Sequence, residues 1–106
     1  MYTGVIIKSS LRDPRILEQF KVLKQEADED WELYTVEATK EQLEQLSNEL
    51  IKGKWYTHFW QNRDVIVVYK DKIFEFNFDD KASWKPAIDY GLSIGIPAEQ
   101  LDFPIE

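Results

Sequence analysis

Apolar and polar residues alternate most clearly in the second half of the chain, where they predict three consecutive strands. The expected strands span residues 55–60, 65–69 and 73–78, and short polar runs typical of turns separate them. Eight of the 15 aromatic side chains lie between residues 54 and 78. Because bulky side chains suit a pleated, half-buried surface, this meander is expected to be the centre of the fold.

In the last of these strands, phenylalanines at positions 74, 76 and 78 alternate with Glu75 and Asn77. Successive side chains of a strand point to opposite faces, so the pattern predicts a sheet with one covered and one wet face. We therefore expect Phe74 and Phe76 to be core residues.

The first half of the chain predicts two strands and two helices. The strands are expected at residues 2–8 and 31–38. The pair Asp13-Pro14 is typical of a helix start, and an apolar stripe predicts that this helix runs on to Ala27. The stripe consists of Ile16, Phe20, Leu23 and Ala27.

The second helix is predicted by a capping box, in which Thr39 is followed three residues later by Gln42. Its buried face is expected to be leucine-rich, and Gly53 is a candidate for its C-terminal cap. The expected face consists of Leu43, Leu46 and Leu50.

A third helix is predicted to begin at Ser83 and to end at Gly95. Gly91 inside it costs about 1 kcal/mol relative to alanine, which predicts close approach of another backbone. Pro97 then predicts a short helical turn whose flanking apolar residues dock on the core. The expected docking residues are Ile96, Leu101 and Phe103. The buried face of the third helix is expected to consist of Trp84, Ala87, Ile88, Gly91 and Leu92.

Together these elements predict a single α+β domain over residues 1–106, with the order β-α-β-α-β-β-β-α. The expected architecture is a two-layer sandwich in which helices cover one face of a mainly antiparallel sheet of about five strands. A ferredoxin-like variant is one form of this arrangement.

The amino-acid composition excludes several classes of functional site and disfavours several classes of partner. The chain has no cysteine, which excludes disulfides, thiolate nucleophiles and cysteine-ligated metals. A formal charge of −7 disfavours nucleic acid and anionic membranes as partners, because both are bound largely through Lys and Arg. The first ten residues lack the features of a secretory signal, and no segment is long and apolar enough to cross a membrane. We expect a cytoplasmic protein.

Part of the negative charge is concentrated between residues 26 and 32. A solvated, solubilising loop is the simplest interpretation, and a surface for a basic partner is the functional alternative. A calcium loop is disfavoured because the run contains no glycine.

No catalytic, metal or phosphate motif is present, so an enzyme is not the favoured interpretation. His58 is the one side chain with an ordinary pKa near neutrality, and it lies in an aromatic strand, where histidine usually serves packing. His58 with Glu75, Asp64 or Asp79 could supply metal ligands, but the spacing is not diagnostic. We expect no metal and no cofactor.

Tyr56, His58 and Trp60 share one face of their strand and form the candidate binding face. If helices cover the other face, these side chains could bind a protein or a small ligand. Alternatively, the third helix or the C-terminal tail covers them.

The C-terminal segments AIDYGLSIGIP (87–97) and QLDF (100–103) resemble the ending of a family of short uncharacterised bacterial proteins. Residues 4–11 and the meander residues 55–56 and 68–74 are similar to other parts of that family. The resemblance implies a bacterial, self-contained domain, and the family has no assigned activity.

We therefore expect a small interaction or binding module without catalysis. Its partner would be another protein or a second copy of the chain in a homodimer. A small-ligand-binding protein or an enzyme with a cleft around His58 is the alternative.

Overall fold

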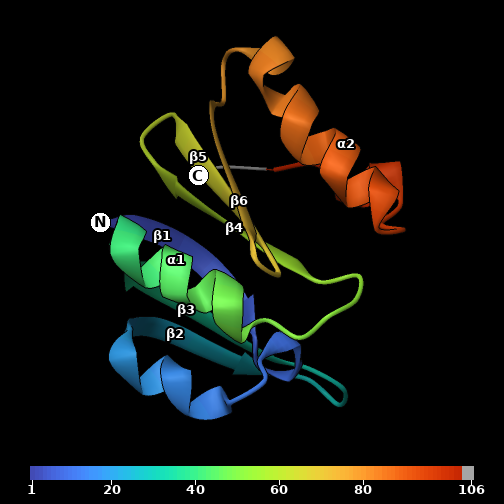
Figure 1. The fold of residues 1–106 in the computed structure, drawn as a ribbon. Helices are drawn as coiled ribbons and strands as arrows, with labels where there is room; N and C mark the ends of the chain where they lie inside the picture. The colour runs from blue at the N-terminus through green and yellow to red at the C-terminus, as the bar shows by residue number, and fades with distance from the viewer. Residues whose placement is uncertain (104–106) are drawn as a thin grey trace.

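A six-stranded sheet with the order β2-β3-β1-β4-β5-β6 organises the protein, and every neighbouring pair of strands is antiparallel (Figure 1). The computed structural model describes residues 1–103. The strands are β1 (Tyr2–Ile7), β2 (Lys21–Ala27), β3 (Glu32–Ala38), β4 (Tyr56–Gln61), β5 (Asp64–Tyr69) and β6 (Lys72–Asn77).

The helix predicted from Asp13 to Ala27 is wrong. Asp13 does cap a helix, since its carboxylate accepts from the backbone N–H of Arg15, but the helix is a short 3-10 segment, η2 (Pro14–Gln19). The chain then enters β2, which forms a hairpin with β3. The acidic residues near position 29 lie at the tip of this hairpin.

The apolar stripe gave a wrong prediction of a long helix because only the first half of the stripe is buried. Ile16 and Phe20 lie in the core, whereas Leu23 is 50 % exposed and lies at an irregularity in the β2–β3 pairing. Residues 21–27 pair with β3 at every position but Leu23, and this pairing prevails over a helical pattern of moderate strength.

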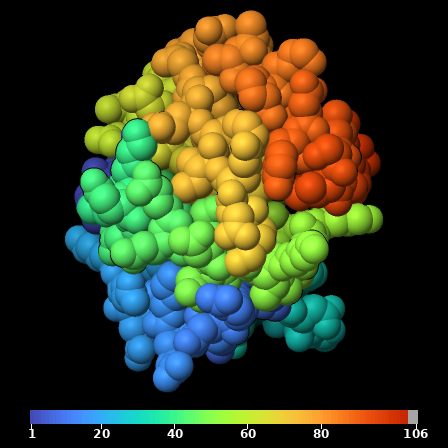
Figure 2. Space-filling view, in the orientation of Figure 1, coloured from blue at the N-terminus to red at the C-terminus, as the bar shows by residue number. Residues whose placement is uncertain are grey.

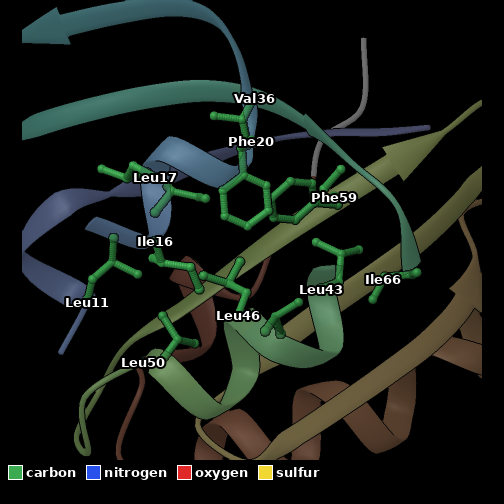
Figure 3. Close-up of a cluster of buried hydrophobic side chains, with 13 residues drawn as sticks. Leu11, Ile16, Leu17, Phe20, Val36, Leu43, Leu46, Leu50, Phe59 and Ile66 are labelled. Atoms are coloured by element: carbon green, nitrogen blue, oxygen red, sulfur yellow. The ribbon is translucent and has the colours of Figure 1, made fainter. Parts of the chain in front are cut away.

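The first core lies on the face of the sheet covered by η2 and α1 (Lys40–Glu49). The capping box is confirmed: the Thr39 side chain accepts from the backbone of Gln42, and the Gln42 side chain accepts from the Thr39 N–H at 2.8 Å. Figure 3 shows Leu43 and Leu46 of α1 pointing into the cluster that holds Phe20, Phe59 and Ile66, with Leu50 at its edge. Gly53 is not the cap, because Leu50 occupies that position.

The second core lies on the opposite face and is built mainly from rings. Here α2 (Lys85–Ser93) and the C-terminal tail cover β5 and β6, and the predicted Phe76 is buried. Alternate residues of β5 enter different cores, with Val65 and Val67 in this one and Ile66 and Val68 in the first. Helices therefore lie on both faces, and the prediction that they cover one face is wrong.

The predicted meander of three strands is confirmed, and two tight turns connect its strands. Asn62 and Asp71 have φ angles of 55° and 59°, a left-handed conformation that Asn and Asp tolerate better than most residues. Each turn joins two strands in direct register, with Gln61 opposite Asp64 and Tyr69 opposite Lys72.

The C-terminal block follows the prediction except at the start of its helix, where Ser83 lies inside a 3-10 segment and Trp84, not Ser83, is the N-cap of α2. A 3-10 turn (Lys81–Trp84) leads into α2, and Gly95, with φ 93°, follows its last turn. A Cβ on Gly91 would lie 2.7 Å from atoms of both Tyr69 and Leu101, so the close neighbours are side chains rather than a second backbone. Leu92, expected on the buried face, is 46 % exposed.

Beyond α2, the short turn η4 (Ala98–Gln100) begins after Pro97, as predicted. The three predicted docking residues of the tail are buried. The protein is thus α+β with an antiparallel sheet, but its order is β-β-β-α-β-β-β-α, with six strands. A ferredoxin-like arrangement is not confirmed. Within residues 1–103, no helix has the length and hydropathy needed to cross a membrane.

Candidate binding face of the sheet

Tyr56, His58 and Trp60 project from β4 toward the face that carries α2. The opposite side of β4 supplies Thr57 and Phe59, which are buried against the first core. This division follows from the period-two alternation of a strand and confirms that the three candidate residues share a face.

The C-terminal tail covers part of this trio. The ring of Phe103, which is fully buried, lies 5.8 Å between centroids from both Tyr56 and His58. The Tyr56 hydroxyl donates to the backbone carbonyl of Gln100. Burial, with a smaller contribution from the Asp102 carboxylate, raises the pKa of Tyr56. Tyr56 is therefore a docking point for the protein's own tail.

Trp60 lies where this cover ends. Its ring packs against His58 at 5.6 Å, and across the strand pairing Trp60 lies opposite Thr3 of β1. Trp60 and His58 are both half-buried. Thus β4 marks the boundary between a covered half of this face, over β5 and β6, and an uncovered half over β1 and β3.

The uncovered half presents apolar side chains to solvent. Val5 of β1 is 38 % exposed, and Ile7 and Leu33 are half-buried and pair across β1 and β3. We call this surface the open strip. It consists of Thr3, Val5, Ile7, Leu33, Thr35 and Trp60.

Charges of both signs border the open strip on the side of β2. Lys21 lies 3.5 Å from Glu37, its pairing partner on β3, and Lys24 lies 2.7 Å from Glu26. All of these side chains are at least partly exposed, so the ion pairs are of the weak, exchangeable kind. The strip is therefore an apolar centre with a mixed-charge border, which is the usual anatomy of a protein interface.

The proposed catalytic and metal roles of His58 gain no support from its surroundings. Glu75 projects to the opposite face, where it pairs with Lys40 at 2.8 Å. Asp79 is engaged by Arg63, whose Nε donates at 2.9 Å, and the Arg63 hydrogen bond holds the pKa of that carboxyl below its usual value. Asp64 lies beyond Trp60, at the turn opposite Gln61. Within residues 1–103, no three His, Asp or Glu side chains cluster as metal ligands do.

Sequence reasoning found Trp60 but missed Val5, Ile7 and Leu33. Their alternation with buried residues of β1 and β3 was a usable signal. The alternation alone does not show which face stays open, and the predicted helix over residues 13–27 was expected to cover part of the sheet.

The chain matches no protein-family model, and no curated protein or solved structure is significantly similar to it. Functional inference therefore rests on the geometry of the sheet.

Proposed function

We propose that the protein is a non-catalytic interaction module that docks through the open strip, and that its simplest partner is a second copy of itself. The observation that carries this proposal is the uneven covering of one sheet face. The half over β5 and β6 is closed by α2 and the tail, whereas the half over β1 and β3 leaves Val5 exposed.

A two-fold assembly suits this surface for two reasons. An isologous interface uses the same patch twice, so a single apolar strip is sufficient for both copies. The border also carries Lys21 and Lys24 together with Glu26 and Glu37, so lysines of one copy can meet carboxylates of the other. Trp60, at the boundary of the strip, is of the residue type most enriched in interface hot spots.

Substitution of Val5 by lysine tests the proposal. In an isolated copy the new ammonium group reaches water, because the side chain at this position is already exposed. At a two-fold contact it would bury a charge without a partner, which is costly. Val5→Lys should therefore shift the species seen by light scattering from dimer to monomer while the circular dichroism spectrum is unchanged, and Trp60→Lys should do the same.

Leu92→Lys is the matched control, because Leu92 is an apolar residue of α2 with a similar exposure, 46 % against 38 % for Val5. It should leave the dimer intact. A wild type that stays monomeric at millimolar concentration would refute self-association, and equal effects of Val5→Lys and Leu92→Lys would remove the strip as the interface.

The resemblance to short bacterial proteins is compatible with this proposal, since it implies a self-contained domain with no assigned activity. We infer a cytoplasmic module that requires neither cofactor nor metal.

A further inference from the structure

A hollow of about 560 Å³ lies where three segments that are far apart in the sequence meet. The loop after α1, the β5–β6 turn and the end of α2 come together there on the face shown in Figure 2. The lining residues are Lys52, Gly53, Lys70, Asp71, Tyr90 and Ile94.

Two lysines line this hollow although the chain as a whole carries a charge of −7. These are Lys52, from the loop after α1, and Lys70, directly after the end of β5. The opposing charge in the lining is Asp71, whose carboxylate lies 3.6 Å from the Lys70 ammonium. The lining therefore carries an excess of positive charge.

Two contacts fix the position of the Lys70 ammonium group. It donates to the backbone carbonyl of Asn48, and the adjoining turn is fixed by a 3.0 Å bond from the Asp71 N–H to the Ser47 carbonyl. An ammonium has three donors, so these contacts leave capacity for an anion. A charge positioned before the ligand arrives loses little entropy on binding.

The other wall of the hollow is formed by the ring of Tyr90 and the aliphatic side chain of Ile94. The Tyr90 ring packs against Tyr69 and Phe74 with centroids 4.9 and 5.6 Å apart, and Ile94 lies one helical turn beyond. Positive charge on one wall and an aromatic surface on the other match a ligand with a carboxylate and a flat apolar body. We propose that this hollow binds a small aromatic carboxylate, independently of docking at the open strip.

Three probe compounds separate the contribution of the negative charge from that of the aromatic ring. Phenylacetate has both the carboxylate and the ring, inorganic phosphate has charge without a ring, and benzyl alcohol has a ring without charge. A ligand that binds the native state alone raises Tm with concentration. Phenylacetate should raise Tm and move the backbone NMR signals of Gly53 and Tyr90, and either other probe should have less than about a tenth of its affinity.

Lys52→Gln removes one of the two lining ammonium groups at an exposed position, so it should fold normally and weaken phenylacetate binding about tenfold. Lys85→Gln is the control, because it removes the same charge from an exposed site on the outer side of α2, and it should leave the affinity within a factor of two.

Equal Tm shifts with all anions, equal effects of the two variants, or NMR changes elsewhere would overturn the proposal. All Tm values are compared at one protein concentration, because the Tm of a dimer changes with concentration, and the NMR shifts locate the ligand whatever the oligomeric state. Loss of dimer formation in Val5→Lys with phenylacetate binding retained would separate the two sites.

Discussion

Strands β5 and β1 lie on either side of β4, yet β5 is buried on both faces after its first residue, whereas β1 is buried on a single face. Residues 65–69 of β5 are all buried, because the first core covers one face and the second core covers the other. In β1, Gly4 and Ile6 are buried while Val5 is exposed. The apolar pattern of a strand thus reports how many of its faces are covered.

The two cores also differ in what fills them. Leucine, isoleucine and valine dominate the core under α1, whereas the core under α2 stacks rings of Phe76, Trp84 and Phe103 at 5.2 to 5.5 Å. Each aromatic side chain buries a large area, so one short helix and an irregular tail are enough to close this half of the sheet.

The largest effect is expected where β6 meets the second core. Phe76 is buried among rings, so Phe76→Ala should lower the free energy of unfolding by about 3–5 kcal/mol. Glu75 projects to the other face and is exposed, so Glu75→Ala should cost less than about 0.5 kcal/mol. Denaturant melts with the opposite order would mean that the faces of β6 are reversed.

A second experiment compares valines on the two halves of the face that carries α2. Val67→Ala empties space beneath the tail and should cost about 2 kcal/mol. The same change at Val5, on the open strip, should cost less than about 0.5 kcal/mol in the monomer. Urea titration of both variants at low protein concentration measures the difference, and equal costs would contradict the uneven covering.

Gly91 tests how tightly α2 is seated. Alanine favours the helix by about 1 kcal/mol, but its Cβ would lie 2.7 Å from Leu101 and from the Tyr69 hydroxyl. That hydroxyl is fixed by a 2.7 Å bond to the Ala87 carbonyl. We expect Gly91→Ala to destabilise by a net amount of about 1 kcal/mol in thermal melts.

The same substitution in a Leu101→Ala background provides the control. With the leucine side chain removed, the added Cβ should cost less than it does in the wild type. An unchanged cost would indicate that Leu101 is not the obstacle.

The smallest effect is expected for the ion pair between Arg63, in the β4–β5 turn, and Asp79, which lies just after β6. The Arg63 hydrogen bond lowers the pKa of Asp79 in the folded state, so the stabilisation is present above the carboxyl's ordinary pKa and is lost as pH falls through the folded value. Asp79→Asn should therefore lower Tm slightly at about pH 6 and not at about pH 2. Asp80→Asn is the control, and an equal pH dependence there would refute the assignment.

Local signals predicted much of this fold. The capping box at Thr39 and Gln42, the alternation around Phe76 and the end of the third helix at Gly95 depend on neighbours in the chain, and all three features are present. The face on which α2 packs depends on tertiary contacts, such as Phe103 against Trp84, that no local pattern encodes.

The error at residues 21–27 has a similar origin. Ile16 and Phe20 fit a helix and are buried, but the continuation of the stripe through Leu23 only simulated a helical face. Because β2 is an edge strand exposed along its length, it lacked the run of apolar residues that identifies a buried strand. The sequence predicted that Trp60 belongs to the candidate face. It did not predict how far that face extends, because β2 was expected to be part of a helix.

The central position of β1 also constrains the order of assembly. Hairpin β2–β3 and meander β4–β6 each form from segments close in sequence, which is rapid. Strand β1 joins them, and its pairing of Thr3 with Trp60 spans more than half of the chain. During synthesis the first strand can pair with β3 early, but its other edge stays open until β4 has been made, so completion of the sheet waits for the second half of the polypeptide.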